Sequence, residues 1–170
     1  MGAWGYMMRE SDDGLDTMSE LKVDAKGVLD VDKNGINNII ENLTDNMYSW
    51  ICIENEHKTF MHVVSEIVYE LSMNNIDDLC KYSELRKQIR KIKKIEISYF
   101  AFKDLINEMT AYLEFNKSDE GKEYWTTEDT RQDCIKYIEK QLEVLQKVET
   151  PRYLDDIDDL AKKIILFIKE

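Results

Sequence analysis

The sequence predicts an all-α protein, a single domain of about six or seven helices packed around a buried central helix. Three observations predict this class. The chain has 170 residues, of which 43% are hydrophobic, so it can bury a core of its own. It holds one proline and six glycines, the residues that most often interrupt helices. Apolar residues recur at steps of three and four along most of the chain, which is the period of one helix face.

Residues 1–35 are expected to form an N-terminal segment with a short helix and a polar loop, and residues 36–170 the helical bundle. The short helix begins at the polar cluster after Ser11 and ends before Gly27. Its apolar positions are Leu15, Met18 and Leu21. The next helix is expected to run from Ile36 to about Trp50.

The segment 59–73 is apolar nearly all round, which predicts the buried centre of the bundle. Its apolar residues are Phe60, Met61, Val63, Val64, Ile67, Val68 and Leu71. On the same segment His62 and Glu66 stand one turn apart, a spacing that can supply two metal ligands. Because no third or fourth ligand accompanies them, an ordinary pair on the helix surface is the favoured interpretation.

The second half of the chain predicts four further elements in order. A helix begins at Asp77 and carries apolar positions up to Ile95. A helix over 99–115 and a loop over 116–122 follow. A long helix then begins at Thr126 or Thr127 and carries an apolar seam to Val148. Beyond Pro151 the last helix is expected from about Tyr153 to Lys169.

The charge of the chain narrows the class of partner. The formal net charge is −12 and the isoelectric point is near 4.7, which disfavours nucleic acid and anionic membranes because both require a basic face. One basic stretch exists, from Arg86 to Lys94, but it lacks the interleaved aromatic residues that stack on bases. No secretory signal and no membrane-length apolar run is present, so a cytoplasmic protein is expected. The cysteines Cys52, Cys80 and Cys134 lie far apart, which predicts reduced thiols.

The stretch from Asp30 to Glu41 fits the spacing of a twelve-residue EF-hand calcium loop. The ligands it would supply to Ca²⁺ are Asp30, Asp32, Asn34, Ile36 through its backbone carbonyl, Asn38 and Glu41. Asn37 stands where EF-hands carry an aliphatic residue, and the chain has no second loop of this kind. The alternative is that Asp32, Asn34 and Gly35 form a polar turn that caps the following helix, and this alternative is favoured.

The predicted last helix begins with four aspartates, Asp155, Asp156, Asp158 and Asp159. Acidic residues favour a helix N-terminus, but four in so short a stretch repel one another. A basic protein partner that docks on them would relieve this repulsion. A solvated acidic face is the simpler alternative.

The first residues, Met1-Gly2-Ala3-Trp4-Gly5-Tyr6, are followed by the acidic run Glu10-Ser-Asp-Asp13 and a short helix. This opening resembles a family of small uncharacterised bacterial proteins, a domain of unknown function, that begin Met-Gly-Ala/Thr-Trp-Gly. The resemblance covers about the first twenty residues. It implies a bacterial, intracellular protein and supplies no catalytic residues.

No stretch of the chain fits a nucleophile elbow, a phosphate-binding loop or a dinucleotide fingerprint. The sequence therefore predicts a non-enzymatic protein-binding module, most concretely an immunity or antitoxin-like protein that covers a basic partner such as a toxin domain. The alternative is a calcium-binding protein that uses the loop at 30–41. Neither the partner nor the oligomeric state follows from the sequence.

Overall fold

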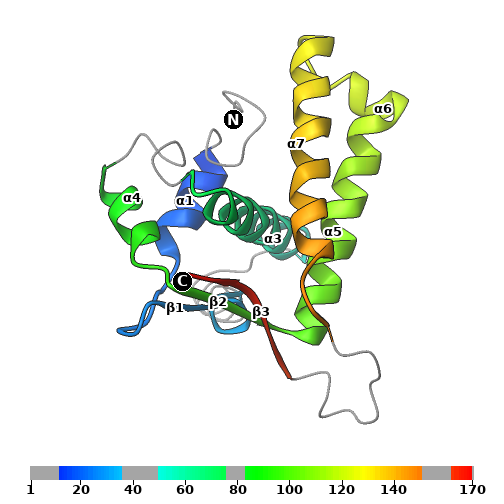
Figure 1. Ribbon diagram of the computed structural model, residues 1–170. Helices are drawn as coiled ribbons and strands as arrows, with labels where there is room; N and C mark the ends of the chain where they lie inside the picture. The colour runs from blue at the N-terminus through cyan, green and yellow to red at the C-terminus, as the bar shows by residue number, and fades with distance from the viewer. Residues whose placement is uncertain (1–11, 36–49, 76–82, 151–161, 170) are drawn as a thin grey trace.

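The computed structural model describes residues 12–35, 50–75, 83–150 and 162–169 (Figure 1). The elements along the described chain are α1 (Asp12–Glu20), β1 (Val28–Asp30), α3 (Trp50–Ser72), α4 (Ser83–Arg90), β2 (Lys94–Ser98), α5 (Tyr99–Lys117), α6 (Asp119–Lys122), α7 (Glu128–Gln146) and β3 (Lys163–Ile168). Residues 31–35, directly after β1, are helical as well.

The expectation of an all-α protein is wrong, because the largely helical chain also forms a three-stranded mixed sheet of order β1-β2-β3. Strand β1 pairs with β2 in parallel, and β2 pairs with β3 antiparallel. Two predicted helices are corrected by this sheet. The helix expected up to Ile95 ends with α4 at Arg90, and the helix expected to reach Lys169 is replaced at its end by β3.

The two strands that replace predicted helical segments, β2 and β3, bury alternate residues, which is the period of a strand and not of a helix. In β2, Ile95 and Ile97 are buried while Glu96 between them is partly exposed. In β3, Ile164 and Leu166 are buried while Ile165 between them is exposed. These strands have five and six residues, so each apolar run fits a helix face as well as it fits a strand.

A glycine turn brings β1 alongside β2. Gly27 has a φ of +85°, a backbone conformation that side chains other than glycine rarely adopt. Its carbonyl accepts hydrogen bonds from the backbone N–H groups of Lys93 and Lys94. A Cβ atom at this position would lie 2.6 Å from the carbonyl oxygen of Lys91, so the close approach of the two segments also requires glycine.

Helices cover one face of the sheet, and α3 lies at their centre (Figure 1). It packs against α1, α5 and α7 and also contacts β3. The predicted central helix is confirmed, because every apolar residue named above between Phe60 and Leu71 is at most 5% exposed. The described part of this helix begins at Trp50, so the polar residues 55–58 do not interrupt it.

Polar side chains lie between α3, α5 and α7, inside this helical layer. Glu66 and Glu70 are buried, and Tyr137 on α7 donates a hydrogen bond of 2.7 Å to Glu70. His62 stacks on Tyr112 of α5 with ring centroids 4.3 Å apart. The interpretation of His62 and Glu66 as a surface pair is therefore wrong. The hydroxyl of Tyr112 lies 3.9 Å from the thiol of the buried Cys134.

Burial determines the protonation of His62. It lowers the pKa of this imidazole from 6.5 to about 4. A hydrogen bond to the carbonyl of Glu108 favours the charged form and so opposes this effect, but burial is the larger of the two. The folded protein therefore keeps His62 neutral at a pH at which the unfolded chain protonates it. Since the unfolded state binds the proton first, His62 makes the free energy of unfolding fall as the pH drops from about 6.5 towards 4.

We expect His62→Phe, which keeps a ring against Tyr112, to reduce this loss of stability by up to about 3 kcal/mol at the acidic end of the window. Urea unfolding of both proteins at several pH values between about 6.5 and 4.5 measures it. His57→Gln is the matched control, because His57 is partly exposed and bonds Asp104 on the surface. Equal pH slopes for the parent and His62→Phe would contradict the assignment.

Candidate functional site

The ends of the three strands bring four polar residues together. Asp30 is the last residue of β1, and Ser98 is the last residue of β2. Because these strands are parallel, their C-terminal ends lie side by side at the same end of the sheet. Strand β3 is antiparallel to β2, so its first residue, Lys163, lies opposite Ser98 at the same end of the sheet. Asp32 follows β1 in the helical residues 31–35.

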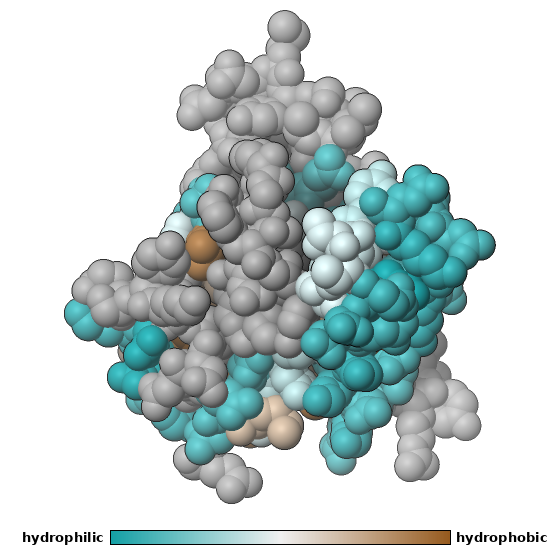
Figure 2. Space-filling model, turned by 90° about the horizontal axis from the view of Figure 1, so that it is seen from above, coloured by the Kyte–Doolittle hydropathy of each residue, from teal (hydrophilic) through white to brown (hydrophobic). Residues whose placement is uncertain are grey.

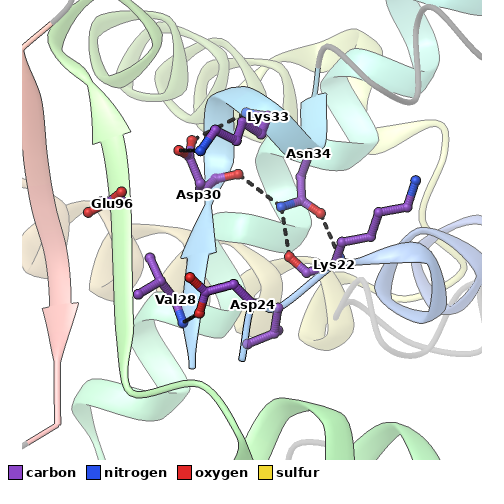
Figure 3. Close-up of a pocket in the computed structure, with 8 residues that line it drawn as sticks. Lys22, Asp24, Val28, Asp30, Lys33, Asn34 and Glu96 are labelled. Carbon is purple, nitrogen blue, oxygen red and sulfur yellow. Dashed lines mark hydrogen bonds and ion pairs between the residues drawn. The ribbon is translucent and has the colours of Figure 1, made fainter. Parts of the chain in front are cut away.

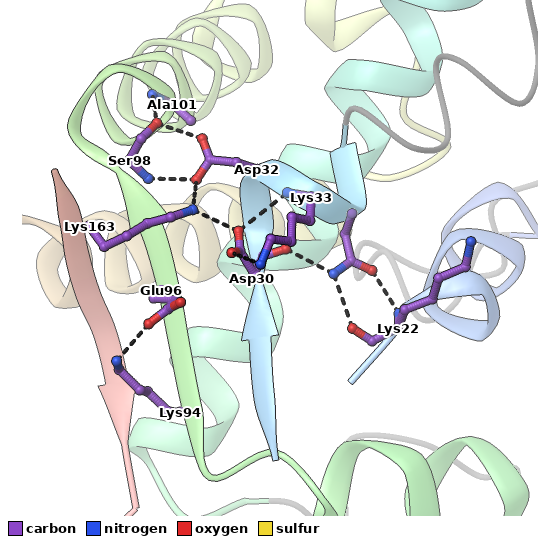
Figure 4. Close-up of polar contacts among 10 residues, drawn as sticks. Lys22, Asp30, Asp32, Lys33, Lys94, Glu96, Ser98, Ala101 and Lys163 are labelled. Carbon is purple, nitrogen blue, oxygen red and sulfur yellow. Dashed lines mark hydrogen bonds and ion pairs between the residues drawn. The ribbon is translucent and has the colours of Figure 1, made fainter. Parts of the chain in front are cut away.

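Lys163 lies between the two carboxylates (Figure 4). Its Nζ is 2.7 Å from Oδ1 of Asp30 and 2.6 Å from Oδ2 of Asp32. Asp32 also accepts hydrogen bonds from the backbone N–H and the hydroxyl of Ser98, at 2.7 and 2.5 Å. The Ser98 oxygen in turn accepts from the backbone N–H of Ala101, which caps the N-terminus of α5. We call Asp30, Asp32, Ser98 and Lys163 the strand-end cluster.

The electrostatics of the strand-end cluster favour its charged form. Burial acts to raise the pKa of Asp30 and of Asp32. The hydrogen bonds and the charge of Lys163, together with hydrogen bonds from Lys33 to Asp30 and from Ser98 to Asp32, outweigh burial, so both pKa values lie below the ordinary range. Burial likewise acts to lower the pKa of Lys163, and the two carboxylates reverse that effect. The stability from both aspartates is present above their unfolded pKa and is lost as the pH falls through the lower folded values.

The strand-end cluster holds two of the expected calcium ligands, Asp30 and Asp32, in contacts within the protein. The third, Asn34, is buried and accepts from the backbone N–H of Lys22, while its amide nitrogen donates to the carbonyls of Lys22 and Asp30 (Figure 3). Of the predicted calcium loop at 30–41, the structure describes residues 30–35, which are the last residue of β1 and the helical residues 31–35. Calcium would have to replace Lys163 between the two carboxylates.

The remaining expected ligands, Ile36, Asn38 and Glu41, lie outside the described residues, so calcium binding stays a prediction of the sequence. A hollow of about 250 Å³ lies beside Asp30 and Asn34 (Figure 3). Lys33 lies on its wall and pairs with Asp30 at 3.2 Å. In the parts of the chain that the structure describes, no three carboxylate, imidazole or thiol side chains are grouped to hold a metal ion.

We expect Lys163→Met to lower the free energy of unfolding by about 1 to 2 kcal/mol, between the values for exposed and buried ion pairs, because two carboxylates lose their cation. Urea unfolding at neutral pH measures this as a lower midpoint with an unchanged slope. Lys169→Met is the control, since Lys169 is exposed just beyond the end of β3. A similar change in both variants would show that the strand-end cluster adds no stability.

The opposite end of α5 carries a different group of side chains. There α5, α6 and the start of α7 meet, away from the sheet (Figure 1). Phe115 on α5 and Tyr124 after α6 are 36% and 72% exposed, and their rings meet edge to face with centroids 5.4 Å apart. Exposed aromatic rings in contact are typical of protein-binding surfaces.

The segment of the chain that carries this aromatic pair is rich in carboxylates. Residues 114–133, which we call the acidic tip, contain seven acidic and three basic side chains. Each basic side chain already pairs with a carboxylate: Lys117 with Glu139, Lys122 with Asp119, and Arg131 with Glu128. Glu114 and Glu123 directly precede the two aromatic residues, and Glu120 lies between them on α6; these three exposed carboxylates have no ion pair with a described residue. Figure 2 looks down on this end and shows its hydrophilic surface.

The backbone of the acidic tip is held by buried contacts. The side chain of Asn116 accepts a hydrogen bond of 2.8 Å from the Trp125 indole N–H and donates one of 2.8 Å to the carbonyl of Tyr112. The carbonyl of Asn116 accepts from the guanidinium of Arg131 at 2.7 Å. At Gly121 a Cβ atom would lie 2.0 Å from the carbonyl oxygen of Phe115, so only glycine fits there. The tip therefore presents its aromatic rings on a fixed frame.

Sequence reasoning missed this surface. It expected a loop over 116–122, where the structure has the end of α5 and the short helix α6. It did not single out Phe115 or Tyr124. The signal was an aromatic pair, Tyr124-Trp125, next to a run of acidic residues, but a sequence pattern does not say which ring is exposed. The four aspartates at 155–159 lie outside the described residues, so their role stays a prediction.

The basic stretch from Arg86 to Lys94 is divided between α4 and β2 and does not lie on one helix. Within it, Lys94 pairs with Glu96 at 2.6 Å. None of the described helices combines the length and the apolar character that a membrane crossing requires. Comparison of the chain with protein-family models, curated proteins and solved structures finds no match.

Proposed function

We propose that this chain is a non-enzymatic protein-binding module that docks on a basic partner through its acidic tip. The observation that carries the proposal is the exposure of Tyr124, at 72%, edge to face with Phe115 beside carboxylates that no described cation neutralises. Aromatic side chains at the centre of an interface supply most of its binding energy. Surrounding charges raise the association rate and select partners of opposite sign.

The rigid frame of the acidic tip supports this function. A binding surface that is already ordered loses little conformational freedom when the partner arrives. The bonds of Asn116 to Trp125 and Arg131 provide that order before binding. A solvated acidic face with no partner would need neither the exposed rings nor the fixed turn.

The more specific proposal is an immunity or antitoxin-like protein that covers a basic toxin domain. The net charge of −12, the absence of a catalytic motif in the sequence and the resemblance of the first residues to a bacterial family support it. The run Asp155 to Asp159 would be a second acidic surface on the same chain. A partner that covers both the acidic tip and the 155–159 run would form a larger interface than one that covers the acidic tip alone.

Photo-crosslinking in the organism of origin can identify the partner. The photoreactive residue p-benzoylphenylalanine replaces Tyr124 in one protein and Phe100 in the control. Phe100 is a suitable control because it is 69% exposed but lies at the other end of α5. We expect mass spectrometry to find a basic protein that is linked from position 124 and not from position 100.

With that partner purified, we expect Tyr124→Ala to weaken binding by about 2 kcal/mol, or roughly thirtyfold in Kd, while Phe100→Ala has little effect. Glu120→Lys with Glu123→Lys should slow association roughly tenfold and reduce its salt dependence, because the steering charge is reversed. Glu143→Lys, an exposed charge on α7, is the control. Stopped-flow kinetics at several salt concentrations measures these rates.

The same kinetics test the second acidic surface through Asp155→Lys with Asp158→Lys. If only this pair slows association, the partner docks at the 155–159 run and the assignment to the acidic tip is wrong. If no charge variant changes the association rate, or if the linked protein is acidic, electrostatic docking on a basic partner is excluded.

A further inference from the structure

The aromatic pair of the acidic tip leaves a ring face open to another molecule. The ring centroids of Phe115 and Tyr124 are 5.4 Å apart and the ring planes make an angle of 63°, so the edge of one ring meets the face of the other. In such a pair, the ring that supplies its edge keeps both of its faces clear of the other ring. Tyr124 is 72% exposed, so most of its ring is in contact with solvent. A side chain of another protein can therefore stack on it.

The turn after α5 fixes the backbone that carries both rings. The N–H of Ser118 donates to the carbonyls of Glu114 and Phe115. Its hydroxyl oxygen accepts a hydrogen bond of 3.0 Å from the N–H of Gly121. The N–H of Tyr124 in turn donates to the carbonyl of Gly121 at 3.2 Å. Because this frame is formed before a ligand arrives, a contact that depends on ring orientation costs little conformational freedom.

The negative charge of the acidic tip is not balanced within the described chain. Its three exposed carboxylates named above, which precede the rings in sequence or lie between them, have no ion pair with a described residue. Lys117 and Lys122 are the nearest cations to the rings along the chain, and each already lies 2.7 Å from another carboxylate. A cation from outside the chain would meet both an open ring face and unpaired carboxylates.

The chemistry of these two groups selects arginine as the side chain that binds them. The face of an aromatic ring attracts a cation through its quadrupole. The guanidinium of arginine is planar and weakly hydrated, so it stacks on a ring while the N–H donors at its edge remain available to a carboxylate. The ammonium of lysine is compact and strongly hydrated, so it loses more when it leaves water for the same contact. An apolar side chain would cover the rings but leave the carboxylates without a cation.

We propose that the acidic tip binds an arginine side chain of its partner, with the guanidinium stacked on Tyr124 beside the unpaired carboxylates. Arginine recognition rests on the protein-binding function proposed above and adds to it the residue type that contacts the rings. It predicts that a short peptide with arginine binds the acidic tip even when the rest of the partner is absent.

The first test uses the full chain, labelled with ¹⁵N, and short synthetic peptides, so it does not require the partner. One peptide carries arginines separated by glycine and serine. A second replaces each arginine by citrulline, which keeps the planar shape without the charge, and a third replaces it by lysine. We expect the arginine peptide to shift the amide signals of 114–125. The citrulline peptide should bind at least roughly tenfold more weakly and the lysine peptide roughly threefold more weakly.

The second test changes the electrons of the ring and not its size. Tyr124→Phe keeps the ring face, whereas pentafluorophenylalanine at position 124 reverses the ring quadrupole, so the face no longer attracts a cation. We expect the arginine peptide to bind Tyr124→Phe within roughly twofold of the parent and the fluorinated protein at least roughly threefold more weakly. Pentafluorophenylalanine in place of Phe100 is the matched control, because Phe100 is 69% exposed at the other end of α5, and it should leave peptide binding unchanged.

Three outcomes would overturn arginine recognition: a citrulline or lysine peptide that binds as tightly as the arginine peptide, equal binding by Tyr124→Phe and the fluorinated protein, or shifts that fall outside 114–125. If these tests fail but Tyr124→Ala still weakens the purified partner, docking at the acidic tip stands and only arginine recognition is wrong. If they succeed but Tyr124→Ala leaves the Kd of the partner unchanged, the arginine site stands and the proposed function is wrong.

Discussion

The bridge from Lys163 to Asp30 and Asp32 is the interaction on which the sheet depends. It joins residues 133 and 131 positions apart, the first and the last strands of the described sheet. Strand β1 has only three residues, too few to hold its place by pairing alone. The lysine links the two outer strands, β1 and β3, on either side of β2. Asp32, which binds the same lysine, also accepts a hydrogen bond from Ser98 at the start of α5. One cation thus positions two strands and a helix.

Helix α5 connects this bridge to the acidic tip. It begins beside Ser98 and ends at Lys117, and nineteen helical residues span about 28 Å. Its middle packs against α3 and α7, so its direction is fixed along most of its length. The sheet end of the molecule is polar but internally neutralised, whereas the far end leaves acidic side chains and two aromatic rings exposed. That difference is what separates a structural contact from a candidate binding surface in this chain.

The helices could be predicted from the sequence where their apolar period was long. The helices near 99–115 and 127–148 correspond closely to α5 and α7, and the segment 59–73 is the buried part of α3, because each buries several turns of one face. The strands could not be predicted in this way. Over so short a run, the spacings of Ile92, Ile95 and Ile97 suit the period of a helix face as well as that of a strand. What makes this segment a strand is its pairing with the segments that hold Gly27 and Lys163, and both residues are distant from β2 in the sequence. The same holds for the strand-end cluster: the spacing of Asp30 and Asp32 predicts calcium ligands, which stays a prediction, whereas their ion pairs with the distant Lys163 leave no local pattern.

The order of the strands bears on how the chain assembles as it is synthesised. Helices α3, α5 and α7 emerge before β3 and contact one another in the fold, so they can pack together while the sheet still lacks its third strand. During that interval the side of β2 that later pairs with β3 is an open strand edge with unpaired backbone N–H and carbonyl groups. Long-range pairing of this kind is slow compared with helix formation. A nascent chain of this protein would therefore pass through a stage in which chaperones, or the β2 strands of neighbouring chains, compete for the position that β3 later takes.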